Sequence, residues 1–469
     1  MKYEQEIKQY FDQHWFEMMQ DIARICSINS EKMPTKEGMP FGEGPYKALC
    51  EFGKIAEEKG FSMKTYGNAV GAVDLSKAER QLDILAHLDV VPAGEGWTVT
   101  EPFNVIMKDG KIYGRGTADD KGPAIVALWA LKCVKDLGIS LGKSARVVVG
   151  TDEECGSGDL PYYYAEEKEA PMTFSPDAEY PVINTEKGAY RPEFSASWKE
   201  DPALPRVISM SGSLKMNVLP GKAYASVEGL DLDVMKKIAA EITEKIGVKF
   251  ILETEESIVK ITAVGEGAHA ASPHKGNNAL TGLIEYLCAL PLAASEGTEK
   301  LHALKKLFPH GDSQGKALNV ALADEISGAL TLTFSMMNWT KTGFTGQFDA
   351  RVPMCSTNEN LRDVVQGKMA AEGITVDESE LNPPHHVAGD SPFVKELLSV
   401  YEEYTGQKGE CIAIGGGTYV HHLDNGVAFG CAMPGTDNRM HGADEFAVID
   451  ELIVSAKMFA QIIVDLCED

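Results

Sequence analysis

The sequence predicts an α/β fold in which a discontinuous domain, with a mostly parallel sheet flanked by helices, is interrupted by an inserted α+β domain. Three observations predict this fold. Apolar strands alternate with helices in the first part of the chain, which is typical of a parallel sheet. Short strands with alternating apolar and polar residues predominate in the middle, and the first pattern resumes after Pro383-Pro384. We therefore expect one domain from residues 1–186 and 382–469, and an inserted domain from residues 187–381.

The elements of the first domain are indicated by their apolar residues. Such residues recur at near-helical spacing over residues 7–25, which predicts a helix. Residues 82–86 form a short apolar strand that runs into His87. Residues 124–137 are apolar almost all round and predict a buried helix, and residues 146–149 predict the next buried strand. Ligands bind beyond the carboxyl ends of strands in such sheets, so acids and histidines that directly follow strands are candidate functional residues.

The middle of the chain has a different pattern. Alternating residues predict strands over 224–228 and 330–334, and amphipathic spacing predicts helices at about 231–246 and 357–372. Strands and helices of this kind indicate an α+β insertion. A strand followed by three glycines and a long terminal helix then complete the first domain, at residues 411–414 and about 447–466.

The composition excludes several classes of protein. The 469 residues include 44 Lys and Arg against 70 Asp and Glu, a net charge of −26 that would repel nucleic acids and anionic membrane surfaces. No stretch approaches about 18 apolar residues, and the N-terminal segment lacks the apolar centre of a secretory signal. The nine cysteines are scattered and form no C-x-x-C pair. We therefore expect no disulfide framework and a cytoplasmic location.

Acids and histidines follow predicted strands, or lie in glycine-rich turns, at five places: His87 with Asp89, Asp119 with Asp120, Glu153 with Glu154, Asp177, and His441. Two histidines and three carboxylates fit a pair of divalent ions better than one ion. One carboxylate can bridge two metals, each of which then takes one histidine and one further carboxylate. Side chains of adjacent residues diverge, so one of Glu153 and Glu154 is expected to bind metal and the other to act as a base.

Eight segments carry a more specific signal. They lie in order between residues 82 and 445 and read LDILAHLDVVPAGEGW, GRGTADDKGP, GTDEECGSGD, SPDAEYPVINTEKG, HAASPHKGNNAL, DARVP, IGGGTY and MHGADE. These segments resemble the motifs of the PepV-type dipeptidases. The latter belong to a dinuclear zinc metallopeptidase family that includes carnosinases, aminoacylases, DapE-type desuccinylases and glutamate carboxypeptidases. The resemblance covers nearly the whole chain.

The resemblance implies a dinuclear centre with two Zn²⁺ per chain, or with Mn²⁺ or Co²⁺ in their place. Its implied ligands are His87, Asp119, Glu154, Asp177 and His441. Asp119 would bridge the two ions, and Glu153 would be the general base. Asp89 is expected to hold the imidazole of His87 in place. Because related sites contain a cis peptide bond at this point, we also expect one between Asp119 and Asp120.

The resemblance makes the insertion a lid domain with residues that act on the substrate. His269 would polarise the scissile carbonyl and stabilise the oxyanion. Arg351 and Asn217 would bind the terminal carboxylate of the substrate, and Gly416 would let the backbone approach the substrate closely. One departure concerns His421, where relatives often have Arg. A contact made by His in place of Arg would be weaker and dependent on pH.

We therefore expect a hydrolase that cleaves dipeptides of the Xaa-Xaa or β-Ala-Xaa type with a dinuclear zinc centre. The expected partner is a small peptide, bound by a monomer, without nucleic acid or membrane. Deacylation or desuccinylation of N-acyl amino acids by the same centre is an alternative. A second alternative is a two-lobed protein that binds peptides without cleaving them. The five candidate ligands and Glu153 are all present in the sequence, which favours an enzyme.

Overall fold

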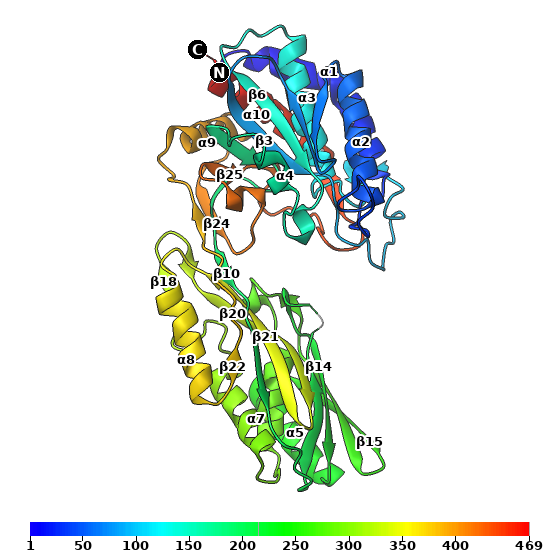
Figure 1. Ribbon diagram of the computed structural model, residues 1–469. Helices are drawn as coiled ribbons and strands as arrows, with labels where there is room; N and C mark the ends of the chain where they lie inside the picture. The colour runs from blue at the N-terminus through cyan, green and yellow to red at the C-terminus, as the bar shows by residue number, and fades with distance from the viewer. Residues whose placement is uncertain (214, 469) are drawn as a thin grey trace. The chain divides into compact units, whose positions relative to one another are not determined.

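The computed structural model describes residues 1–213 and 215–468, which form two compact units. The first unit contains Met1–Thr185, His386–Ile412 and the described chain from Gly417 onwards. The second unit contains Glu186–His385 and Ala413–Gly416. The blue N-terminal and red C-terminal segments accordingly belong to the same unit (Figure 1).

The first unit is built around a largely parallel sheet. The strand order is β1 (Met63–Tyr66), β2 (Val70–Asp74), β6 (Ser144–Gly150), β3 (Arg80–His87), β7 (Met172–Ser175), β25 (Gly426–Ala428), β9 (Val182–Glu186) and β23 (His385–His386), and β24 (Cys411–Ile414) also pairs with β9. Strands β3, β6, β7 and β25 pair in parallel, whereas β1 and β2 run antiparallel to their neighbours. Parallel strands are covered on both faces, which explains why the sequences of β3 and β6 are largely apolar.

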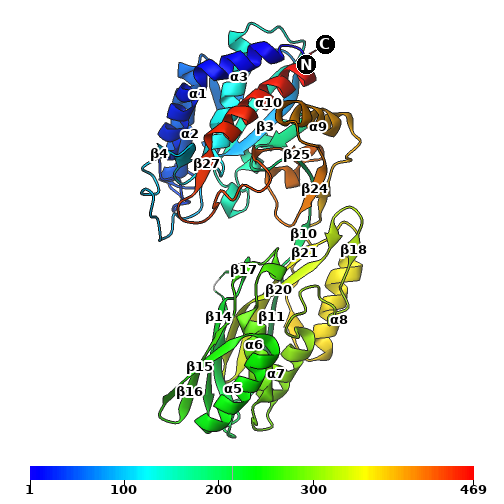
Figure 2. The same cartoon turned by 180° about the vertical axis from the view of Figure 1, so that it is seen from behind.

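Helices cover this sheet. α3 (Lys121–Asp136) is buried almost all round, as its apolar residues predict, because it packs against α1 (Glu4–Cys26) and α10 (Ile449–Cys467). α10 also contacts β3, over which it lies in Figure 2. The other helices of this unit are α2 (Glu43–Glu58), α4 (Leu160–Tyr164) and α9 (Pro392–Thr405), and its short strands are β4 (Ile106–Lys108), β5 (Lys111–Tyr113), β8 (Ala178–Glu179), β26 (Cys431–Ala432) and β27 (Phe446–Val448).

The second unit contains an antiparallel sheet with its own hydrophobic core. The strand order is β15 (Lys249–Glu255), β16 (Ile258–Val264), β14 (Lys222–Glu228), β12 (Arg206–Ser211), β20 (Thr331–Thr340), β21 (Gly343–Val352), β11 (Glu193–Ser197) and β22 (Thr375–Val376), and β10 (Gly188–Tyr190) also pairs with β21. Two short pairs accompany it, namely β13 (Val218–Leu219) with β17 (Ala268–His269) and β18 (Ala323–Asp324) with β19 (Gly328–Ala329).

Helices α5 (Leu232–Ile246), α6 (Ala279–Ala289) and α7 (Glu296–Leu307) lie on one face of the second sheet, in front of it in Figure 2. α5 begins where the carboxylate of Asp231 accepts the amides of Asp233 and Val234, and it ends at Gly247, whose φ is 74°. α8 (Asp363–Ala371) follows a short π-helical turn. No helix in residues 1–213 or 215–468 has the length and apolar character that a bilayer span requires.

The predicted fold class is confirmed, with two differences in the second unit. The strand predicted over 330–334 is the first half of the ten-residue β20, because its pairing with β21 shifts register between Phe334 and Met336 and interrupts the alternation. The helix predicted over 357–372 is divided between the π-helical turn Asn358–Arg362 and α8.

Candidate metal centre

His87 ends strand β3 at the carboxyl edge of the first sheet, and it is 1% exposed. Its Nδ1 lies 3.0 Å from the backbone oxygen of Asp89. A carbonyl oxygen can only accept a hydrogen bond, so Nδ1 must carry the proton. In the neutral ring Nε2 then presents its lone pair, which is the tautomer that binds a metal ion.

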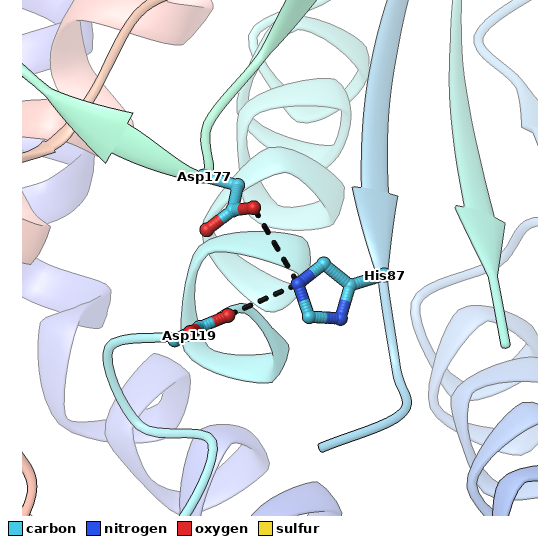
Figure 3. Close-up of side chains that lie close together, drawn as sticks. All are labelled: His87, Asp119 and Asp177. Carbon is cyan, nitrogen blue, oxygen red and sulfur yellow. Dashed lines mark ion pairs between the residues drawn. The ribbon is translucent and has the colours of Figure 1, made fainter. Parts of the chain in front are cut away.

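Asp119 and Asp177 face this Nε2 atom (Figure 3). Oδ1 of Asp119 lies 3.0 Å from it and Oδ2 of Asp177 lies 3.5 Å from it. Asp119 belongs to the turn before α3, and Asp177 follows β7, the parallel neighbour of β3. One imidazole and two carboxylates from separate segments therefore converge on one position.

A second group shares the same aspartate. Oδ2 of Asp119 lies 3.0 Å from Nε2 of His441, and Oε1 of Glu154 lies 3.2 Å from that nitrogen. The two oxygens of Asp119 thus face two different imidazoles. His441 belongs to the loop before β27, and Glu154 to the 3₁₀ turn η1 (Glu153–Cys155). The two groups of candidate ligands thus share Asp119, an arrangement that could hold two ions with one bridging carboxylate.

The nitrogen and oxygen atoms of this cluster are better placed to bind metal ions than to form hydrogen bonds with one another. Nε2 of His87 and Oε1 of Glu154 are buried, and neither has a hydrogen-bond partner in the described part of the chain. A buried polar atom without a partner is costly, and such atoms are rare in folded proteins. Nitrogen and oxygen atoms that lie about 3 Å apart without forming a hydrogen bond are typical of side chains that bind the same metal ion. The residues therefore fit a pair of divalent cations.

The electrostatics of the cluster favour a cation. The nearby carboxylates of Asp119 and Glu154 raise the pKa of His441 to about 11. Burial lowers the pKa of His87, but the carboxylates of Asp119, Asp177 and Asp89 outweigh it and raise this pKa well above its ordinary value. Burial also raises the pKa of Glu153 well above its ordinary value. The cluster thus holds excess negative charge that a bound cation would neutralise.

The side chain of Asp89 holds the backbone of Glu153 and Glu154 in place. Its Oδ1 accepts the amide of Glu153 at 3.1 Å, and its Oδ2 accepts the amide of Glu154 at 3.1 Å. Its Oδ1 also lies 3.4 Å from Nδ1 of His87, further than its own backbone oxygen. The backbone oxygen of Asp89 thus makes the hydrogen bond to His87, and the Asp89 side chain accepts two amides that the sequence did not predict.

The second unit contains the remaining candidate residues. His269 lies on β17, paired with Val218 of β13, and the next residue, Ala270, donates its amide to the backbone oxygen of Asn217 at 2.9 Å. The amide of Ala271 donates to Nδ1 of His269 at 3.2 Å. Because Nδ1 accepts, the neutral ring carries its proton on Nε2, and Nε2 is then a hydrogen-bond donor.

Arg351 is held in place inside the second unit. Its Nε and Nη2 donate to the two oxygens of Asp349 at 2.8 and 3.0 Å, and its Nη1 donates to the backbone oxygen of Gly415. A guanidinium has five N–H groups, so these contacts leave two for a ligand. At Gly416 an added Cβ would meet only Ile414 Cδ1, at an ordinary 3.8 Å, so packing within the described chain does not require glycine there.

Two further features surround the ligands. The peptide bond between Asp119 and Asp120 is cis, as predicted, and Asp120 accepts the amide of His87 at 3.0 Å. Glu445 accepts three amides of the loop that carries Asp119. Both acids lie in the segments GRGTADDKGP and MHGADE, but neither a residue type nor a spacing indicates which amides a buried acid accepts.

Comparison with known proteins supports the resemblance. The family model of Peptidase family M20/M25/M40 matches residues 84–465. The chain is 33% identical over 458 residues to the protein named Putative dipeptidase YtjP from Bacillus subtilis (strain 168), covering 96% of this chain and 97% of that protein. It is 34% identical over 460 residues to Beta-Ala-Xaa dipeptidase from Lactobacillus delbrueckii subsp. lactis, covering 96% of each.

Solved structures share the fold. Human carnosine dipeptidase 1 matches with a TM-score of 0.60 at 15% identity, over 100% of this chain and 99% of that one. The di-peptidase Dug1p from Saccharomyces cerevisiae matches with a TM-score of 0.60 at 13% identity, over 100% of both chains. The predicted resemblance is therefore confirmed at the level of the family and the fold. The chain belongs to Peptidase family M20/M25/M40.

Proposed function

We propose that the protein is a dinuclear zinc dipeptidase that cleaves Xaa-Xaa or β-Ala-Xaa dipeptides. The observation that carries the proposal is the position of Asp119, whose two oxygens face the imidazoles of His87 and His441 at 3.0 Å each. The names of the relatives from Bacillus subtilis and Lactobacillus delbrueckii support a dipeptide substrate. Mn²⁺ or Co²⁺ could replace Zn²⁺, since imidazole and carboxylate ligands accept all three.

Two ions would be held by His87, Asp119, Glu154, Asp177 and His441. When bound, they would supply Lewis-acid activation of the scissile carbonyl and of a water molecule. Glu153 would accept the proton of the attacking water and pass it to the leaving amine. Asp89 holds the backbone of Glu153, so the base keeps its place beside the ligand Glu154.

We propose that the second unit supplies the residues that recognise the substrate, as a lid domain of residues 187–381, and that residues 1–186 and 382–469 form the catalytic domain. His269 would donate from Nε2 to the oxyanion, which agrees with the amide donated to its Nδ1. Arg351, oriented by Asp349, would bind the terminal carboxylate with its two remaining N–H groups. Asn217 and Gly416 would contribute further contacts to the substrate.

A substrate panel tests this function. Purified protein with added Zn²⁺ should hydrolyse free dipeptides faster than N-acyl amino acids, and Glu153→Gln should lose this turnover. Glu57→Gln is a matched control, since Glu57 is an exposed glutamate of the first unit. Preferential cleavage of N-acyl amino acids would favour the deacylase alternative. Unchanged turnover in Glu153→Gln would contradict the assigned base.

We also propose that the protein acts as a monomer in the cytoplasm. All nine cysteines are free, which supports a reducing compartment. If one chain carries every residue that the reaction needs, mixing inactive His269→Ala and Glu153→Ala chains should restore no activity. Recovered activity would show that subunits share sites.

A further inference from the structure

Glu445 is a fully buried acid that contacts the loop of the bridging ligand. Its Oε1 accepts the backbone amides of Gly116 at 2.9 Å, Ala118 at 3.1 Å and Asp119 at 3.3 Å. Three amides that converge on one charged oxygen fix the path of the backbone around it. The position of Asp119 therefore depends directly on the side chain of Glu445.

Arg115 extends this contact to other loops. It is 1% exposed, and its Nη1 donates to Oε2 of Glu445. Its Nη2 donates to the backbone oxygen of Gly442 at 3.0 Å and lies 3.3 to 3.4 Å from the backbone oxygens of residues 92–93. Gly442 directly follows His441, and residues 92–93 belong to the loop that begins after β3. The ion pair thus joins the loop of Asp119, the loop of His441 and the loop that follows the strand of His87.

The loop of His441 needs such support. His441 has a φ of 62°, in the left-handed region that is unfavourable for a residue with a Cβ atom. A residue keeps this conformation only where surrounding contacts hold it. Beyond His441, β27 pairs with β5, and the amide of Gly114 donates to the backbone oxygen of Glu445 at 3.0 Å. These contacts anchor the end of the loop, and Arg115 holds its middle.

We propose that the Arg115–Glu445 pair is a positioning device that sets the separation of Asp119 and His441, and with it the affinity for the metal ion bound by Asp119, Glu154 and His441. The inference rests on the dinuclear centre proposed above. A buried ion pair is a poor source of stability but can select one arrangement of the chain. Outer residues of this kind typically change metal affinity 10- to 100-fold when they are replaced.

Glu445→Gln tests the proposal, because it keeps the shape of the side chain and removes the charge that holds Arg115. Full-length protein stripped of metal is titrated with Co²⁺ and followed by calorimetry and by visible absorption. Wild type should bind two equivalents. The variant should bind one equivalent about 10- to 100-fold more weakly, with a changed absorption spectrum.

Asp21→Asn is the matched control. Asp21 is also a buried acid of the first unit, and it pairs with Lys59 at 2.8 Å and accepts from Trp129 at 2.8 Å. This control should lose stability without any change in Co²⁺ binding. An equal loss of affinity in Asp21→Asn would overturn the proposal, because general destabilisation would then explain both results.

Unchanged affinity and spectrum in Glu445→Gln would also overturn the positioning role. If that variant does not fold, Arg115→Lys, which keeps the charge and loses the planar fork, is judged by the same two criteria. Wild-type protein that binds fewer than two equivalents would contradict the proposed function and this inference with it. Two equivalents in wild type together with an unaltered Glu445→Gln would contradict only the inference.

Discussion

Asp89→Asn is expected to lower kcat/KM for a dipeptide about 10- to 150-fold. Both oxygens of Asp89 accept backbone amides, from Glu153 and Glu154, at 3.1 Å each. Asparagine offers one oxygen, so its NH₂ group must face one of these amides and leave a buried donor without a partner. A hydrogen bond to a charged acceptor contributes about 1.5 to 3 kcal/mol. If the displaced backbone moves the base Glu153 and this energy is lost from transition-state stabilisation, kcat/KM falls by the stated factor.

The assay is the rate of dipeptide hydrolysis at saturating Zn²⁺, with thermal unfolding of the same samples. Asp312→Asn is a matched control, because the Asp312 carboxylate also accepts backbone amides, those of Gln314, Lys316 and Ala317, but belongs to the second unit. The control should keep its activity. A change of less than twofold in Asp89→Asn, or an equal loss in both variants, would refute the reasoning.

Three further predictions concern metal, substrate and pH. Dialysis against a chelator should abolish hydrolysis, and Zn²⁺, Mn²⁺ or Co²⁺ should restore it; activity that survives metal removal contradicts the centre. Arg351→Ala should cost about 2 to 5 kcal/mol in transition-state binding for free dipeptides and little for amidated ones, so equal losses would exclude the carboxylate contact. Burial raises the pKa of Asp83 to about 7, against about 3.9 in the unfolded chain. The folded state then binds the extra proton, so stability should fall as pH rises from about 4 through 7. Denaturant unfolding should show a smaller fall in Asp83→Asn than in wild type, and identical pH profiles of the two proteins would contradict this prediction.

A helix or strand could be predicted where its apolar residues correspond to the faces that are buried in the fold. The helix predicted over 124–137 corresponds to α3 at Lys121–Asp136, because a helix that is apolar all round must be buried. The strand that ends at His87 could be predicted because its residues are mostly apolar, as a strand in the middle of a parallel sheet requires. The full length of β20 could not be predicted, since the register shift after Phe334 breaks the alternation on which the prediction rests.

The residue types of the candidate centre could be predicted, but their contacts could not. Acids and histidines after strands indicate a metal centre, yet only coordinates show that the two oxygens of Asp119 face different imidazoles. The pairing of Arg351 with Asp349 follows a local rule, because residues i and i+2 of a strand share a face. Glu445 is 329 positions from Gly116, so its contact with that loop depends on the tertiary fold.

The number of metal ions per chain tests the central claim most directly. Equilibrium dialysis of full-length protein against Zn²⁺, followed by elemental analysis, should give two equivalents for wild type. Asp119→Ala should bind sharply less, since both groups of candidate ligands share Asp119. Fully active protein with one equivalent or none, or two tightly bound equivalents in Asp119→Ala, would contradict the account.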